Sequence, residues 1–264
     1  MGQNEQITLN QHYANTLIAA GSSGFIGAFS TFIFASIKKR LQSGQALPSI
    51  TKMGPRAWLA ETFRGSINYS FCFTPPSVIQ QMSDEYGKEK DGSGNESSQL
   101  LKTLFSGAIG GIASTVIENI LLQQQLQKAT ASQATMALIN QSSTRLFRGI
   151  KLIMIREAMF GYCYLKGVKQ AGNYATQHFG ENYVAPAQII VGILGALASH
   201  PVDTTATIMQ RYDYTTKQAA RHLMEQPNPL KSFYRGGLTR VCLFTTAVFV
   251  ISRTQQAVMT RLEN

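Results

Sequence analysis

The chain has 264 residues and a formal charge of +10, because its 24 lysines and arginines outnumber its 14 acidic residues. Only 14% of its residues are charged, whereas soluble domains contain about 25%, so the composition argues against an ordinary soluble domain. The positive charge favours nucleic acid, anionic lipid or anionic solutes as partners. The three cysteines have no metal-type spacing and indicate neither a disulfide framework nor a zinc site.

Six charge-poor segments are expected to form membrane-spanning helices. The first, 15–37, has no ionisable side chain and lacks the polar outer face that a helix of a soluble bundle needs. About twenty residues cross the hydrocarbon core of a bilayer, and the mean hydropathy of −0.06 fits helices with one lipid-facing side and one polar side. In chain order, the other five segments are 66–83, 103–127, 150–170, 184–202 and 237–259.

The connections between these segments alternate in charge. Connection 38–64 has six basic residues and one acidic residue, 128–148 has three basic residues and no acidic one, and 203–240 has six and three. Connection 84–102 instead has five acidic and three basic residues. An even number of spans places both termini on one side and the three basic connections on the other, as the positive-inside tendency favours. Since the basic residues lie in these connections, nucleic-acid binding is not expected.

An aromatic-Arg-Gly triplet recurs three times and divides the chain into repeats. Its glycines lie 84 and 87 residues apart, a period that suits a two-helix membrane module. Each triplet is expected to begin the second helix of a pair, where unpaired backbone N–H groups and an arginine favour a lipid phosphate. The predicted repeats are 1–98, 99–180 and 181–264, within one integral domain. The predicted lipid-binding residues are Arg64, Gly65, Arg148, Gly149, Arg235 and Gly236.

In its three repeats, six spans and basic connections, the chain resembles the mitochondrial carrier family over nearly its whole length. The resemblance implies an all-α membrane protein with six transmembrane helices in three pseudo-symmetric two-helix repeats around a central cavity. It also implies a monomer in the mitochondrial inner membrane, with cardiolipin as a bound anionic lipid and no other cofactor. Small-residue pairs in the first helix of each repeat let helix backbones approach, and Gly107 and Gly111 fit this pattern.

The family's gate on the matrix side uses the motif Pro-x-acid-x-x-basic-x-basic-x-Gln in the first helix of each repeat. The third repeat retains Asp203 and Gln210, and the first retains Lys38 and Gln42 without the acid. By its glycine spacing, the second repeat has no charged residue at these places, and the run of three glutamines at 123–125 leaves this register open by two residues. The resemblance therefore implies one remaining matrix-side pair, Lys38 with Asp203. Without the resemblance, Lys38 would more often be a lysine whose charged end reaches the membrane interface.

The gate on the cytoplasmic side is expected to be weak. Glu85 and Lys88 match the family's acid and base near the end of the second helix of the first repeat. Counting from the other triplets places Gln256 opposite Lys88, where only a hydrogen bond can form. The alternative is that Glu85 and Lys88 are solvated loop charges.

A pair of residues seven and eight positions after each triplet glycine is expected to face the substrate. Arg156 and Glu157 differ from the other pairs, because ionisable groups inside a span are candidates for function. The arginine can bind a carboxylate bidentately and the glutamate can bind an ammonium group, as in carriers of amino acids. The alternative is a pair that compensates its own charge or lies near the membrane interface. The other expected substrate-binding residues are Cys72, Phe73, Leu243 and Phe244.

The predicted function is transport of a small charged metabolite, such as an amino acid, by alternating access. A nucleotide carrier is the alternative substrate class, since Arg240 and Arg253 could help to bind a phosphate. A protein of carrier shape that does not transport, acting as a scaffold or as a bacterial effector targeted to host mitochondria, is the alternative of another class. An enzyme is not expected, because neither a Gly-rich phosphate loop nor a convincing His/Ser/Asp set is present.

Overall fold

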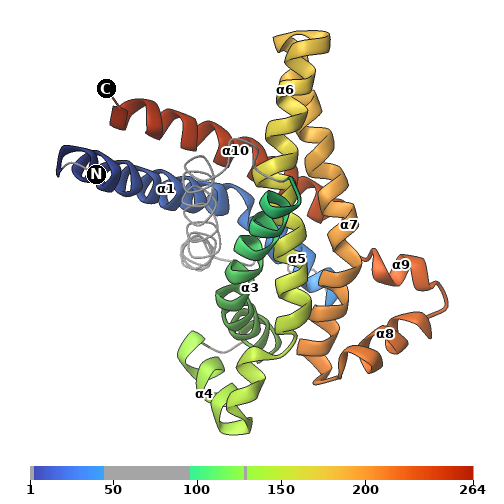
Figure 1. The fold of residues 1–264 in the computed structure, drawn as a ribbon. Coiled ribbons are helices and arrows are strands. Elements are labelled where there is room, and N and C mark those ends of the chain that lie inside the picture. Colours follow the sequence, from blue (N-terminus) through green and yellow to red (C-terminus); the bar gives the residue numbers. More distant parts are fainter. Residues whose placement is uncertain (1–2, 45–95, 128–129, 264) are drawn as a thin grey trace.

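The computed structural model describes residues 3–44, 96–127 and 130–263, and the regular structure in these ranges is entirely helical (Figure 1). The prediction of an all-α protein is confirmed for this part of the chain. The elements are α1 (Gln3–Gln42), α3 (Glu96–Gln127), α4 (Ala131–Gln141), α5 (Ile150–Tyr162), α6 (Val168–Phe179), α7 (Val184–Tyr212), α8 (Thr216–Met224), α9 (Pro229–Phe233) and α10 (Gly237–Glu263). A π-turn at Cys163–Gly167 joins α5 to α6, and 3₁₀ turns span Ser143–Phe147 and Glu181–Tyr183.

Five of the six predicted spans fall on the long helices, and the sixth, 66–83, lies outside the described residues. Within the described ranges, two helical stretches are long and apolar enough to cross a membrane, Leu100–Gln124 and Glu181–Tyr212. The count of six spans and the threefold pseudo-symmetry therefore stay predictions. Gly180, the predicted boundary of the third repeat, ends α6 with φ of 91°.

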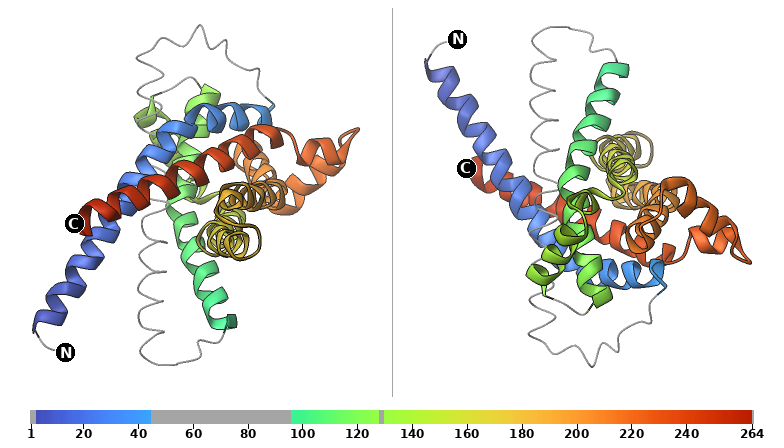
Figure 2. Two further views of the ribbon diagram at one scale, coloured as in Figure 1. Left: turned by 90° about the horizontal axis from the view of Figure 1, so that it is seen from above. Right: turned by 90° about the horizontal axis from the view of Figure 1, so that it is seen from below.

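The long helices pack around α7. Helices α1 and α10 run side by side along much of their length (Figure 2). Helix α3 packs on α5, while α7 packs on α5, α6 and α10. The short helices α4 and α8 lie at one end of the bundle, opposite the end at which α6 stops (Figure 1). Helix α7 thus links the α3–α5 pair to the α1–α10 pair.

Glycines let α3 and α5 approach closely. A Cβ atom on Gly107 would lie 2.6 Å from the carbonyl oxygen of Glu157, and one on Gly111 would lie 2.7 Å from Cα of Met154. Both neighbours are backbone atoms, which cannot move aside independently of their helix. The small-residue pattern of this helix therefore has a steric reason, because a larger residue at either position would push the helices apart.

The second and third predicted repeats are built alike at the local level. Helices α4 and α8 both begin with a capping box, Thr130 with Gln133 and Thr215 with Gln218. The triplet glycines Gly149 and Gly236 have φ of 81° and 82° and directly precede α5 and α10. Glycine adopts this left-handed conformation at less cost than residues with a side chain. The prediction that these two triplets precede long helices is confirmed, and the first triplet lies outside the described residues.

Candidate functional site

Charged side chains from all five long helical segments of the described chain meet in its interior. We call this group the ion cluster, and its members come from α1, α3, α5, α7 and α10. Four are basic and three are acidic, so the formal charge of the group is +1. Burial of a charge is costly unless the charge is paired and hydrogen-bonded. The ion cluster consists of Lys38, Lys39, Glu118, Arg156, Glu157, Asp203 and Arg240.

Asp203 on α7 is the centre of the ion cluster, and its side chain is 0% exposed. Its Oδ2 atom lies 3.0 Å from Nζ of Lys38 and 3.0 Å from Nη1 of Arg240. Its Oδ1 atom lies 2.6 Å from Nη1 of Arg156. The side-chain amide of Gln42 donates a further hydrogen bond to Oδ2 at 2.6 Å. The structure therefore brings together Lys38 and Asp203, and adds two arginines to the same carboxylate.

Arg156 on α5 connects three carboxylates and is 4% exposed. Its Nη1 atom binds Asp203, and its Nη2 atom lies 2.7 Å from Oε1 of Glu118. Its Nε atom donates to Oε1 of Glu157 at 2.9 Å, and Nη2 donates to Oγ of Ser114 at 3.2 Å. Arg156 and Glu157 thus compensate each other in part, as the alternative interpretation of this pair expected. The arginine also binds acids from two other helices.

The expectation that Lys38 and Asp203 are the one remaining pair is wrong. Lys39 on α1 binds Glu118 on α3, with 2.8 Å between Nζ and Oε2. The sequence contains a signal for this acid, because Glu118 stands seven residues before Gln125, as Asp203 stands seven residues before Gln210. Counting from the glycines of the second repeat misses this signal. The described residues therefore contain two ion pairs that join α1 to α7 and to α3, the predicted first helices of the other repeats.

Arg240 on α10 was considered only as a possible phosphate ligand, but here it stabilises Asp203. Its Nη1 atom binds this carboxylate, and its Nη2 atom donates a hydrogen bond to Oγ of Ser199 at 2.9 Å. Its guanidinium group lies 4.7 Å from the centre of the Phe244 ring, within the range of a cation–π interaction. One side chain thus joins α10 to α7 through an ion pair and a hydrogen bond.

The two glutamines predicted at the gate flank the ion cluster. Gln42 accepts a hydrogen bond from Thr207 at 3.3 Å and donates to Asp203. Gln210 accepts from Nζ of Lys39 at 3.3 Å and donates to the carbonyl oxygen of Arg148 at 3.4 Å. Both side chains are buried. They provide hydrogen bonds for buried polar groups, and because the glutamines are uncharged they need no ion-pair partner of their own.

The remaining predicted substrate-binding residues are buried or lie outside the described ranges. Leu243 and Phe244 belong to an apolar core with Phe160, and the rings of Phe160 and Phe244 are 4.4 Å apart. Phe244 faces Arg240 of the ion cluster, as described above. Cys72 and Phe73 are among residues that the structure does not describe.

The predicted cytoplasmic gate also falls outside what the structure describes. This holds for Glu85 and Lys88 and for the side chain of Gln256. Arg253 is exposed, and its guanidinium group lies 5.8 Å from the centre of the Phe249 ring rather than in the ion cluster.

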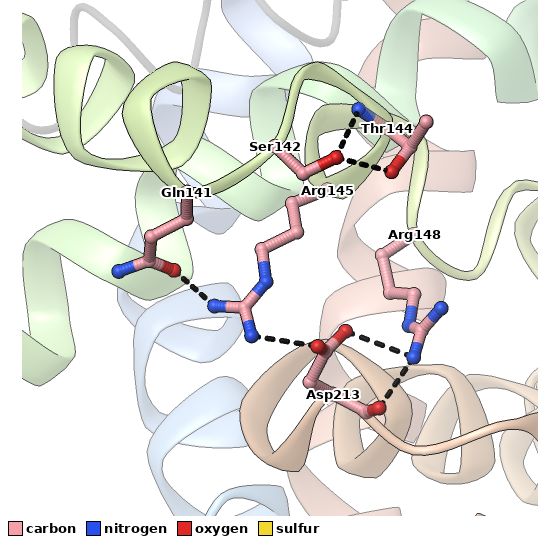
Figure 3. A pocket seen from close by; sticks show the side chains of 6 residues that line it. All are labelled: Gln141, Ser142, Thr144, Arg145, Arg148 and Asp213. Atoms are coloured by element: carbon pink, nitrogen blue, oxygen red, sulfur yellow. Dashed lines mark hydrogen bonds and ion pairs between the residues drawn. The ribbon is translucent and has the colours of Figure 1, made fainter.

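A polar cleft of about 660 Å³ lies beside the second triplet (Figure 3). Arg145 and Arg148 point at Asp213, at 2.6 and 2.8 Å from its two carboxylate oxygens. Arg148, a predicted ligand of lipid phosphate, therefore faces a carboxylate in this conformation. Arg235 of the third triplet is exposed, and its carbonyl oxygen lies 3.2 Å from Nε2 of His200. The cleft is lined by Gln141, Ser142, Thr144, Arg145, Arg148 and Asp213.

Comparison with known proteins gives a distant relative. The mitochondrial glycine transporter B of Danio rerio is 25% identical over 243 residues, which cover 81% of this chain and 84% of the relative. The chain is similar to a mitochondrial transporter. No family model matches the chain. The similarity to the transporter extends over most of both sequences.

Proposed function

We propose that the chain is a carrier-type transporter that moves a small amino acid across the mitochondrial inner membrane by alternating access. The observation that carries the proposal is the ion cluster, in which five helical segments meet at seven buried or largely buried charged side chains. Charges inside a bundle of apolar helices mark substrate pathways and gates. The two apolar stretches and the similarity to a mitochondrial transporter give further support.

Arg156 and Glu157 have the chemistry to hold both ends of an amino acid. A guanidinium group binds a carboxylate through two parallel hydrogen bonds, and the adjacent carboxylate can accept hydrogen bonds from the substrate's ammonium group. The side chain of Glu157 is 17% exposed, whereas that of Asp203 is 0% exposed. Because the relative is named as a glycine transporter, glycine is the first substrate to test.

Lys38, Asp203, Gln42 and Gln210 form the proposed gate on the matrix side. Their hydrogen bonds and ion pairs join α1 to α7 across the interior. The second pair, Lys39 with Glu118, joins α1 to α3. Alternating access requires that both connections break when this end opens. The gate therefore depends on more interactions than a lone Lys38–Asp203 pair would supply.

A nucleotide is the less favoured substrate. Its phosphates carry several negative charges and need several cations that are not already paired. Arg240 binds Asp203 and Ser199, and Arg253 lies on the exposed side of α10. The positive excess of the ion cluster is a single charge, which suits a zwitterion or a small monoanion better.

Anionic lipid is the proposed partner at the triplets. In the described part of the chain, Gly149 and Gly236 directly precede α5 and α10, and Gly149 is buried whereas Gly236 is half-buried. Arg148 and Arg235 lie next to these glycines and are partly or fully exposed. A monomer in a membrane rich in cardiolipin is the proposed working form.

The proposal is tested by transport into liposomes. The purified full-length chain is reconstituted and given labelled glycine, other amino acids and ATP. We expect saturable glycine uptake that Arg156→Ala reduces at least tenfold, whereas the surface variant Arg221→Ala keeps wild-type rates. Arg221 is 75% exposed and pairs only with Glu225 among the contacts of its side chain that the structure describes. Absence of uptake or exchange of every compound would instead favour a scaffold that does not transport.

A further inference from the structure

We infer that Arg156 belongs in turn to the gate and to the substrate site, so that the substrate's carboxylate takes the first step of gate opening by drawing the arginine away from Asp203 and Glu118. This inference rests on the proposed function and deepens it. It makes Glu118 a competitor of the substrate and Glu157 a ligand of the substrate. The two glutamates therefore have opposite effects on affinity.

The argument begins with the atoms of Arg156 that a carboxylate needs. A bidentate carboxylate uses two parallel N–H groups of one guanidinium. Here Nη1 lies 2.6 Å from Oδ1 of Asp203, and Nη2 lies 2.7 Å from Oε1 of Glu118. Both terminal nitrogens thus bind acids that belong to other helices. Glu157 of the same helix also binds Nε and Nη2, and it can keep Nε while a substrate occupies Nη1 and Nη2. A substrate can bind at this guanidinium only by displacing at least one of the two acids from other helices.

The two displaced acids each keep another cation. Asp203 retains Lys38 and Arg240, each at 3.0 Å, together with the amide of Gln42. Glu118 retains Lys39 at 2.8 Å. The transfer of Arg156 to the substrate therefore leaves neither carboxylate buried without a positive partner. A buried charge without a partner is the main energetic obstacle to such an exchange.

The exchange also changes which helices are connected. Arg156 is on α5, Asp203 on α7 and Glu118 on α3. When the arginine turns to a substrate, the ionic connections of α5 to α7 and α3 in the ion cluster are lost, while Lys38 and Lys39 still join α1 to both. Opening then requires only that the Lys38 and Lys39 pairs break as well, and the carboxylate of the substrate is needed for the first of these steps. An amine without a carboxylate cannot displace either acid.

The test measures KM and maximal rate for labelled glycine in liposomes that contain the full-length chain. Glu118→Gln is expected to lower KM about fivefold or more, as for a typical coupling between sites, because one competitor for Arg156 is removed. Glu157→Gln is expected to raise KM by a similar factor. Glu225→Gln, on the exposed surface, is the matched control and should change neither value.

A second variant keeps the test decisive if Glu118→Gln fails to fold. Lys39→Gln removes the other cation of Glu118, so this acid should hold Arg156 more firmly and KM should rise. Analogues give a test without mutation: acetate should inhibit glycine uptake competitively, and methylamine should not. Transport with an unchanged or raised KM in Glu118→Gln, or inhibition by methylamine but not by acetate, overturns the inference alone. Failure of the wild-type chain to transport overturns the proposed function and the inference with it.

Discussion

The second and third predicted repeats (99–180 and 181–264) share their local structure but hold their helix pairs together in different ways. In the second repeat, α3 and α5 approach until Gly107 and Gly111 touch the opposite backbone. In the third repeat, α7 and α10 are joined by Arg240, which binds Asp203 and Ser199. One interface depends mainly on the absence of side-chain bulk, and the other depends on charge.

The acid of the ion cluster also differs between the two predicted repeats, and the third repeat again depends more on ion pairs. Asp203 is 0% exposed and binds three cations, whereas the side chain of Glu118 is 16% exposed and binds two. Both acids share Arg156. The comparison teaches that the structural role of an acid in this position depends on how many helices its partners connect. Asp203 connects α7 with α1, α5 and α10, while Glu118 connects α3 with α1 and α5.

The largest effect is expected for Asp203→Asn. Removal of one partner of a buried ion pair costs about 3–5 kcal/mol, and here the change removes the charge that three cations share. We expect a large loss of thermal stability in detergent and no transport. Glu118→Gln is the matched variant in the second repeat, and its stability loss should be clearly smaller, because Glu118 is partly solvated. Equal losses would show that the two acids are structurally equivalent.

The next largest effect is expected for Lys38→Ala, which tests how far Asp203 depends on this one cation. The carboxylate keeps Arg156 and Arg240 at 2.6 and 3.0 Å, so we expect a stability loss below that of Asp203→Asn and faster leak of loaded glycine from liposomes. The double variant Lys38→Asp with Asp203→Lys should not restore activity, since the new lysine would face two arginines. Recovery in the double variant would mean that the pair acts alone, as the motif by itself implies.

Much of this arrangement could be predicted from the sequence, and the part that could not has a geometric reason. Charge-free segments located the helices, and the family motif paired Lys38 with Asp203. Glu118 was missed because it stands seven residues after Gly111, whereas Asp203 stands eleven after Gly192. The difference of four residues is about one helical turn. The acid therefore stays on the same face of its helix but lies about one turn closer to the glycine. The contacts of Lys39 and Arg240 depend on how the helices cross, which a sequence pattern does not specify.

A smaller effect is expected where the second repeat depends on glycine. Gly107→Ala places a Cβ atom 2.6 Å from a backbone oxygen of α5, and overpacking of this kind costs about 1–3 kcal/mol. Thermal unfolding in detergent measures the loss. Gly172→Ala is the matched control, because its Cβ atom would meet the flexible end of Gln188 at 3.0 Å, and its midpoint should stay close to that of the wild type. If both variants lose the same stability, close backbone contact is not what holds α3 to α5.

The smallest effect on stability is expected for Asp213→Asn, which tests the connection between the two repeats at the polar cleft. Asp213 ends α7 with φ of 58°, a conformation that asparagine also adopts readily. The ion pairs that it makes with Arg145 and Arg148 are partly exposed, and such pairs contribute about 0–1 kcal/mol. The substitution should therefore change the unfolding midpoint little, but it leaves two arginines beside Gly149 without their acid. Cardiolipin should then stabilise the variant more than it stabilises the wild type, whereas neutral lipid should not. An equal response to cardiolipin in the two proteins would mean that Arg148 does not bind lipid phosphate from this cleft.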